Sequence, residues 1–301
     1  MKMNLLSFRP VAYLEYLLVR SLDLIYGLVP AKKAYAWGFA FAVKLYPLFA
    51  KRRRVAVDNI IRAGITEDKA NADRIARHAF GHLAGHICEA LKIGQVVTEE
   101  NWRDHIIYDG PEESWRLLLH SPGVPILILT GHHGVWEAAA SILSYSRPLI
   151  AVARKMNNPF VDRFLKQKHF RGDIMLVPKK MGFTSHALRE WKNRGAAMTL
   201  LMDQHAGPRQ GIQVDFMGHM AYTHTSPARL HLMSGSPILV GSFIRESAFK
   251  YRMVTGSPLF YKPTGNKLTD TRSLLTEVNA QLATIIRRFP EQYLWAHKRW
   301  K

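Results

Sequence analysis

The 301-residue chain is long enough for one large α/β domain or two small ones, and its 48% hydrophobic content supplies a full core. Its single cysteine, Cys88, excludes a disulfide framework within the chain. The formal net charge of +19 indicates an acidic partner, such as nucleic acid, an anionic membrane surface or an acidic protein. The sequence has no RNA-binding aromatic motif, zinc-finger spacing or Lys/Arg tail, so we do not expect nucleic acid to be that partner.

Residues 1–54 are expected to form membrane-associating helices. Residues 11–30 are apolar but carry three charges, and residues 35–50 are apolar and aromatic and end in the basic cluster Lys51-Arg-Arg-Arg54. No run of 18 uncharged apolar residues and no cleavable signal peptide is evident. We therefore expect amphipathic or re-entrant helices in the membrane interface, pinned by the basic cluster. Two ordinary helices that cover a core are the alternative, and a single tilted span is less favoured.

Residues 55–301 are expected to form one α/β domain, with a helical lead-in at 55–120 and an α/β core at 121–301. The lead-in repeats apolar residues at helical spacing and contains a short strand at 105–108 and a helix after Pro111. The core is predicted to contain strands at 125–130, 148–154, 174–177, 196–202, 212–217, 237–245 and 250–259, and helices at 135–143, 157–165, 184–193, 226–235 and 270–289. We found no repeat or low-complexity linker, so the simplest architecture is a mixed central sheet flanked by helices, with a helical N-terminal segment.

A Gly-His-His-Gly turn lies between the strand at 125–130 and the helix at 135–143, and it carries the strongest candidate site. His132 sits where the strand ends and the helix begins, the position at which α/β sheets bind ligands. Glu137 lies about one turn into the helix, so its carboxylate is within reach of the His132 ring. A His–carboxylate pair is the smallest general-base unit. His133 is given at most a supporting role. The simpler interpretation of His132 and Glu137 is an ordinary loop histidine and an acidic residue at the start of a helix.

Four sequence blocks agree with one known family. The blocks are Thr130-Gly-His-His-Gly-Val-Trp-Glu137, Arg154-Lys-Met-Asn-Asn-Pro159 with Arg171-Gly172, Asp203-Gln204 through Leu230, and Pro290 to Lys301. The first resembles the His-x4-Asp/Glu motif of glycerolipid and lysophospholipid-type acyltransferases. Together, over about residues 125–301, the blocks resemble the bacterial lipid A biosynthesis (lauroyl/myristoyl) acyltransferase family, which also includes acyltransferases of phosphatidylinositol mannosides. The chain departs from the family pattern at Met217, where Phe is usual, and in the charges that interrupt the N-terminal span.

The resemblance implies transfer of a fatty acyl chain from a thioester, either acyl carrier protein or acyl-CoA, to a hydroxyl of a membrane glycolipid such as a lipid A precursor. It implies no metal, no other cofactor and no covalent acyl-enzyme. It also implies a place at the inner membrane with the catalytic domain on the cytoplasmic face. Within that chemistry His132 deprotonates the acceptor hydroxyl and Glu137 holds His132. The excess positive charge fits acidic carrier proteins, phosphorylated glycolipids and the inner leaflet alike.

The thioester carbonyl becomes an oxyanion that needs hydrogen-bond donors. Arg171 is the first candidate donor and the turn amides near Gly134 are the second. Arg154 is an alternative donor or a bidentate ligand for acceptor phosphate, and Asp203, at a strand end, is placed to orient that arginine. Arg229, Lys298 and Arg299 are weaker candidates for contacts with phosphate or with acidic groups of a carrier protein. Surface charge is the simpler interpretation of Arg154 and Arg171, and a loop-closing role is the simpler interpretation of Asp203.

Three alternative functions stay open at this point. A lysophospholipid or phosphatidylinositol mannoside acceptor keeps the chemistry and changes the pathway. A metal hydrolase built on His132, His133 and Glu137 is disfavoured, because His-Glu-x-x-His is absent and adjacent histidines seldom face one ion. A non-catalytic basic membrane-binding protein explains the charge but leaves the turn with its histidine and glutamate unexplained.

Overall fold

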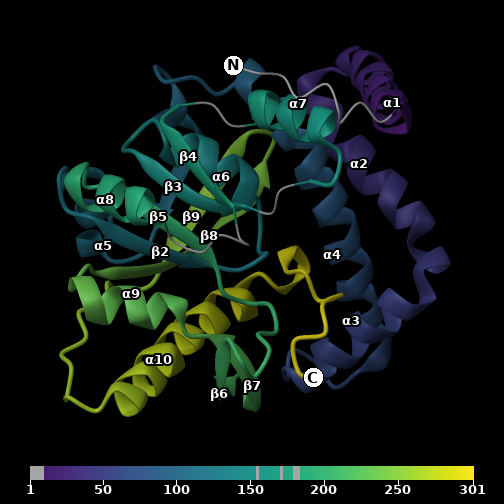
Figure 1. Ribbon diagram of the computed structural model, residues 1–301. Helices are drawn as coiled ribbons and strands as arrows, with labels where there is room; N and C mark the ends of the chain where they lie inside the picture. Colours follow the sequence, from purple (N-terminus) through teal and green to yellow (C-terminus); the bar gives the residue numbers. More distant parts are fainter. Residues whose placement is uncertain (1–9, 154–155, 170–171, 179–183) are drawn as a thin grey trace.

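A seven-stranded sheet crosses the centre of the protein, with helices on both faces (Figure 1). The computed structural model describes residues 10–153, 156–169, 172–178 and 184–301. The strands are β1 (Ile106–Asp109), β2 (Ile126–Thr130), β3 (Leu149–Ala153), β4 (Ile174–Pro178), β5 (Ala197–Leu201), β8 (Ile238–Ser247) and β9 (Lys250–Thr255). They lie in the order β1-β9-β8-β2-β5-β3-β4, with β8 and β9 antiparallel and all other neighbours parallel. The predicted α/β class with a mixed central sheet is confirmed.

The sheet separates two apolar cores, because successive side chains of a strand point to opposite faces. Ile126 and Ile128 of β2 lie in the core covered by α5 (Glu112–Leu119) and α6 (Trp136–Leu143). Leu127 and Leu129 lie in the larger core, under α8 (Ser185–Asn193), α9 (Ser226–Ser234) and α10 (Lys267–Arg288). Since β2 is buried on both faces, it reads in the sequence as a continuous apolar run.

The N-terminal part of the chain forms a helical arm beside the sheet (Figure 1). Its helices are α2 (Ala31–Leu45), α3 (Ala50–Arg62) and α4 (Lys69–Ala90), with 3-10 turns at Tyr46–Phe49, Ile93–Gln95 and Trp102–His105. The helical lead-in predicted from residue 55 onward is divided before Asp68, whose carboxylate caps α4 by accepting the Ala70 and Asn71 amides. The domain boundary expected between residues 54 and 55 lies within helix α3. The division of the chain into a membrane-associating part and an acyltransferase domain stays a prediction.

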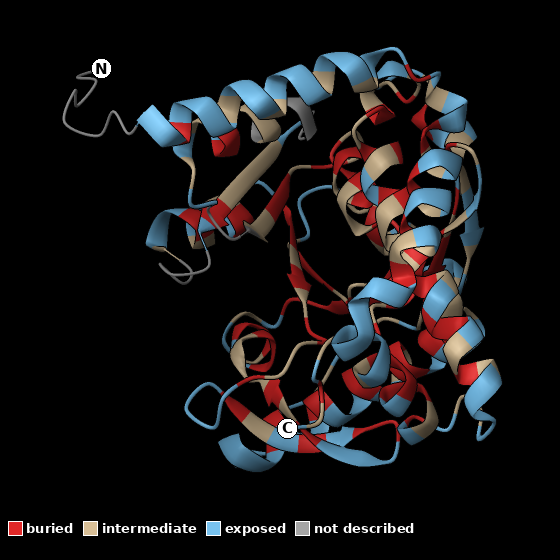
Figure 2. Ribbon diagram, turned by 90° about the vertical axis from the view of Figure 1, so that its right-hand side faces the viewer, coloured by how far each residue is buried: buried red, intermediate tan, exposed pale blue. Residues whose placement is uncertain are grey.

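Helix α1 (Pro10–Gly27) has two different faces, and its C-terminal end contacts the arm through a hydrogen bond from the Tyr26 hydroxyl to the carbonyl of Cys88. One face packs on α7 (Pro159–His169), where Tyr13 and Tyr16 contact Phe160 and Tyr16 also contacts Phe164. The opposite face is an exposed apolar stripe, which consists of Val11, Leu14, Leu18, Leu22 and Ile25. Figure 2 shows α1 as mostly exposed along its length. Among the described residues, no helix combines the length and the apolar character needed to cross a bilayer.

A separate antiparallel hairpin consists of β6 (Gly211–Phe216) and β7 (His219–His224). The sequence predicted the first strand but not the second. Met217 and Gly218 close the turn, both with positive φ, as a tight hairpin turn requires. Asn279 of α10 fixes the hairpin against the domain by donating to the carbonyl of Asp215 and to Thr223 Oγ1.

Candidate active site

The candidate site lies where two neighbouring parallel strands end. Thr130, the last residue of β2, pairs with Leu201, the last residue of β5. His132 and Asp203 each follow two residues later, so the register brings both to the same edge of the sheet. The carboxyl ends of parallel strands are the usual ligand-binding edge of an α/β sheet.

His132 and Asp203 form a hydrogen-bonded pair. The imidazole Nδ1 lies 2.9 Å from Asp203 Oδ1, and Asp203 Oδ2 accepts the backbone N–H of His132, also at 2.9 Å. Burial alone raises the pKa of Asp203, but the charge and hydrogen bonds of His132 outweigh it and hold that pKa below its usual value. The ionised carboxylate therefore favours the tautomer with hydrogen on Nδ1.

This tautomer places a lone pair on Nε2, the nitrogen that a general base uses. The side-chain amide of Gln204 lies 3.3 Å from His132 Nε2. The His132 side chain is 18% exposed and that of Asp203 is 2% exposed. A substrate therefore has access to the base but not to the carboxylate behind it.

The structure thus gives Asp203 a partner that the sequence did not indicate, the His132 ring, while the arginines that Asp203 was expected to orient lie outside the described residues. Asp203 holds the His132 ring through Nδ1, the role that the sequence predicts for Glu137. Glu137 lies in the first turn of α6, where it lines an apolar cavity between α6 and the sheet. A contact between Glu137 and His132 stays a prediction.

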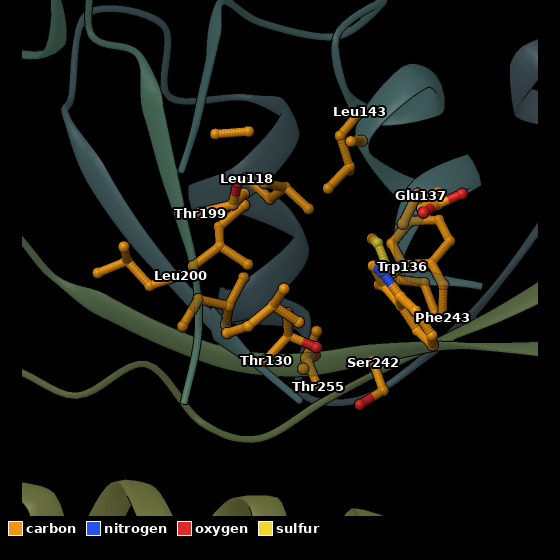
Figure 3. A pocket seen from close by; sticks show the side chains of 18 of the residues that line it. Leu118, Thr130, Trp136, Glu137, Leu143, Thr199, Leu200, Ser242, Phe243 and Thr255 are labelled. Carbon is orange, nitrogen blue, oxygen red and sulfur yellow. The ribbon is translucent and has the colours of Figure 1, made fainter. Parts of the chain in front are cut away.

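An apolar cavity of about 240 Å³ lies between α6 and the sheet (Figure 3). Its walls come from α6, from the six strands β2, β3, β4, β5, β8 and β9, and from α5. They include Leu118, Ala140, Leu143, Leu200 and Met253. Trp136 lines the cavity and also contacts the His132 ring edge to face, with centroids 5.2 Å apart. The cavity therefore begins beside the base and extends along α6 away from it.

His133 has a structural position. Its Nε2 donates to the carbonyl of Phe289, and its Nδ1 accepts from the hydroxyl of Ser242, on the sheet face opposite α6. Complete burial lowers the pKa of His133 to about 4, only partly opposed by the Phe289 carbonyl and by Asp203. His133 is therefore neutral and shielded from substrate, and it supports the turn from inside the domain.

Two candidate residues are corrected by their contacts. The N–H of Gly134 donates to the carbonyl of Gln292 at 2.9 Å, so this amide is already paired and is not a donor for an oxyanion. Arg299 is 3% exposed, and its guanidinium donates to the carbonyls of Gln204 and Tyr222 and to Thr223 Oγ1. It therefore has an internal role in place of the expected contact with phosphate or a carrier protein.

The other basic candidates are not brought to the pair by any described contact. Arg154 and Arg171 lie outside the described residues. Arg229 is exposed on α9, which covers the sheet face opposite the cavity, and Lys298 is exposed in the C-terminal segment. Their proposed contacts stay predictions. Among residues 10–153, 156–169, 172–178 and 184–301, no three His, Cys, Asp or Glu side chains are grouped to hold a metal ion.

Sequence reasoning assigned no role to Gln204 and Trp136, although both stood within quoted motifs. The signal for Gln204 was its place directly after Asp203 at a strand end. Trp136 occupies the first position of α6, immediately after the turn that carries His132. The apolar cavity had no local sequence signal, because its walls come from segments spread over residues 118–255.

Fold and site define an α/β protein with a histidine–carboxylate pair beside an apolar cavity, an arrangement suited to an acyl group. The chain belongs to the bacterial lipid A biosynthesis acyltransferase family, whose family model matches residues 2–301. The resemblance inferred from four blocks therefore extends over the whole chain, including the N-terminal helices, and the protein is an acyltransferase. A comparison with curated proteins gave no match.

Proposed function

We propose that the protein transfers a fatty acyl chain from an acyl thioester, carried by acyl carrier protein or CoA, to a hydroxyl of a lipid A precursor. The observation that supports this proposal most directly is the His132–Asp203 pair next to the apolar cavity. A fatty acyl chain is the substrate part that fits an apolar cavity, and a hydroxyl nucleophile is the part that needs a base.

His132 Nε2 takes the proton of the acceptor hydroxyl as its oxygen attacks the thioester carbonyl. Asp203 stabilises the imidazolium that forms. The tetrahedral intermediate then collapses, the C–S bond breaks, and His132 returns the proton to the departing thiolate. The products are an ester and a free thiol. The Gln204 amide, 3.3 Å from Nε2, is a candidate donor to the oxyanion, together with Arg171 or Arg154.

The direct test is acyl transfer by detergent-purified protein from labelled acyl carrier protein or acyl-CoA onto a lipid A precursor. A lysophospholipid and a phosphatidylinositol mannoside serve as parallel acceptors. We expect product with the lipid A precursor, lost in His132→Ala and retained in the exposed control His120→Ala. Product only with another acceptor would keep the chemistry and replace the pathway. Activity in His132→Ala would exclude this mechanism.

The depth of the cavity is proposed to determine which acyl chain length the enzyme prefers. Ala140 lies one turn of α6 beyond Trp136, and Leu143 lies about two turns beyond it, so both are further from His132. Each methylene that no longer fits loses about 0.8 kcal/mol of burial, or about fourfold in kcat/KM.

We expect Ala140→Leu to shift the preferred donor to a chain about two carbons shorter, with kcat/KM for the original chain reduced about 15-fold. Leu143→Ala enlarges the cavity and is expected to shift the preference the opposite way. Competition between acyl thioesters of different lengths, with products resolved by mass spectrometry, measures both shifts. An unchanged length profile in both variants would show that the acyl chain binds elsewhere.

The exposed stripe of α1 is proposed to lie in the interface of the inner membrane, on its cytoplasmic face. Five apolar residues line one side of α1, while the other side is held on α7 by aromatic contacts and by Arg20 over Phe164. Exposed Lys32 and Lys33 follow at the start of α2, suited to anionic headgroups. Within the predicted basic cluster, Arg53 is paired with Asp73 and Arg52 donates to the carbonyl of Ala296, so only part of its charge faces outward.

The triple variant Leu14→Gln, Leu18→Gln, Ile25→Gln is expected to bind anionic vesicles at least about tenfold more weakly, because each side chain loses apolar burial worth more than 1 kcal/mol. A matched control carries Met233→Gln, Phe260→Gln and Leu268→Gln, which change exposed apolar residues around α9 and the start of α10. Co-sedimentation of both proteins with vesicles provides the comparison. Equal binding of the two triple variants would contradict this membrane orientation.

A further inference from the structure

The C-terminal segment Pro290–Lys301 contacts both loops that carry the catalytic pair. We infer that this segment is a clamp that holds His132 and Asp203 in register, with His297 and Arg299 as positioning residues. The inference rests on the proposed function, and it assigns His297 a role that the sequence motifs did not indicate. It also explains why the Arg299 side chain is buried and does not face a ligand.

The first half of the clamp holds the turn after β2. The N–H of Leu294 donates to the carbonyl of His132 at 3.0 Å, and the carbonyl of Gln292 accepts the N–H of Gly134 at 2.9 Å. His133 and Tyr293 form a β-bridge between these two hydrogen bonds, and their rings meet edge to face. The turn is therefore bound to the segment as a short strand pair, on both sides of His133.

The second half holds the loop after β5. His297 Nε2 accepts the backbone N–H of His205 at 3.1 Å. Arg299 donates to the carbonyl of Gln204, the residue between Asp203 and His205, and ties that loop to the hairpin strand β7 through Tyr222 and Thr223. The segment thus fixes the backbone directly after Asp203.

The clamp is itself anchored on the helical arm. Asn59 of α3 donates to the carbonyls of Trp295 and His297, at 2.8 Å and 2.7 Å. The indole N–H of buried Trp295 donates back to the carbonyl of Pro290. Because the segment is held at both ends and in the middle, it supplies a fixed distance between the two loops rather than a flexible cover.

His297 contributes to the clamp only as a neutral ring, since its Nε2 is an acceptor. Burial lowers the pKa of His297; the Asp203 charge opposes this shift, while His132, Arg299 and Lys301 add to it. Gln at position 297 can place an amide oxygen near the Nε2 position, whereas Asn is one methylene too short. Comparison of His297→Gln with His297→Asn therefore distinguishes the effect of losing this hydrogen bond from the effect of replacing the histidine side chain.

We expect His297→Asn to lower kcat about 10- to 100-fold with KM for both substrates changed less than about threefold, because the base and carboxylate lose alignment while substrate contacts persist. His297→Gln is expected to restore most of the loss. Arg299→Lys, which keeps the charge but loses the forked contacts, is expected to resemble His297→Asn. Lys192→Ala, an exposed change on α8, serves as the control.

A second measurement needs no substrate. Carbethoxylation of His132 by diethyl pyrocarbonate, followed by mass spectrometry across pH, reports the protonation midpoint of this imidazole. We expect the midpoint to move to lower pH in His297→Asn, since the imidazolium loses part of its aligned counter-charge, and to return in His297→Gln. If the wild type transfers no acyl group, the proposed function fails while this measurement still judges the clamp. An unchanged midpoint in His297→Asn, or a change in KM alone, would overturn the inference.

Discussion

Asp203→Asn is expected to reduce kcat for acyl transfer by about 10⁴-fold, the scale observed when the carboxylate of a His–carboxylate pair becomes an amide. The carboxylate accepts both the Nδ1–H and the backbone N–H of His132. An amide at this position offers only one acceptor oxygen, so it cannot accept both hydrogen bonds and favour the same tautomer. The opposite tautomer carries its hydrogen on Nε2 and cannot accept the proton of the hydroxyl.

The pH profile distinguishes Asp203 from Glu137 as the partner of His132. His132 holds the pKa of Asp203 below its usual value despite burial. The carboxylate therefore keeps its charge at pH values where an ordinary aspartate begins to lose it. The acid limb of kcat/KM then reports on the protonation of the base, His132. We expect Asp203→Asn to move this limb to lower pH, and Glu137→Gln to leave it in place. The pairing expected from sequence makes the opposite assignment, so the two variants decide between them.

Gly134→Ala is expected to lower the free energy of unfolding by about 3 to 5 kcal/mol and to abolish activity. Gly134 has a φ of +65°, and a Cβ at this position would lie 1.8 Å from the carbonyl oxygen of Phe243. Phe243 cannot retreat easily, because its strand β8 is paired with β2 on one side and β9 on the other. A shift of the turn instead would carry His132 away from Asp203.

Gly123→Ala is the matched control for this substitution. Gly123 has a similar positive φ of +85°, but a Cβ there meets nothing within 4 Å. We expect it to cost only the backbone preference, about 1 kcal/mol. Urea unfolding curves of the two variants separate the close approach of Gly134 to β8 from the effect of φ alone. Similar midpoints would contradict the packing argument.

Much of the site was predictable from local sequence, and its assembly was not. The apolar run before His132 and the Ala-rich helix after it were predicted, and so was the strand end at Asp203. The hydrogen bond between His132 and Asp203 depends on β2 and β5 being neighbours, although β3, β4 and three helices separate them in the chain. Strand order depends on packing across the whole sheet, so the sequence pattern offered Glu137, five residues away, as the nearer partner.

The roles predicted for Arg299 and Gly134 were wrong because a sequence pattern shows neither the burial of a side chain nor the partner of a backbone amide. A motif of charged residues resembles a ligand site when burial is unknown, and an arginine that ties together three backbone segments has the same local sequence as one that binds phosphate. The second hairpin strand, β7, was missed because its solvent-facing positions include His219 and Met220 and its alternation is weak. The N-terminal segment is helical, as expected, and the contact of these helices with lipid stays a prediction.

The place of β1 in the sheet has a consequence for how the chain matures during synthesis. β1 is an edge strand whose partner is β9, with Ile106 opposite Tyr251. At roughly 5 to 20 residues per second, the ribosome needs about 7 to 30 seconds to deliver that partner. During this interval a short apolar strand with an unpaired edge is open to pairing with other nascent chains. Early release or slow translation between these two strands would therefore favour aggregation over folding.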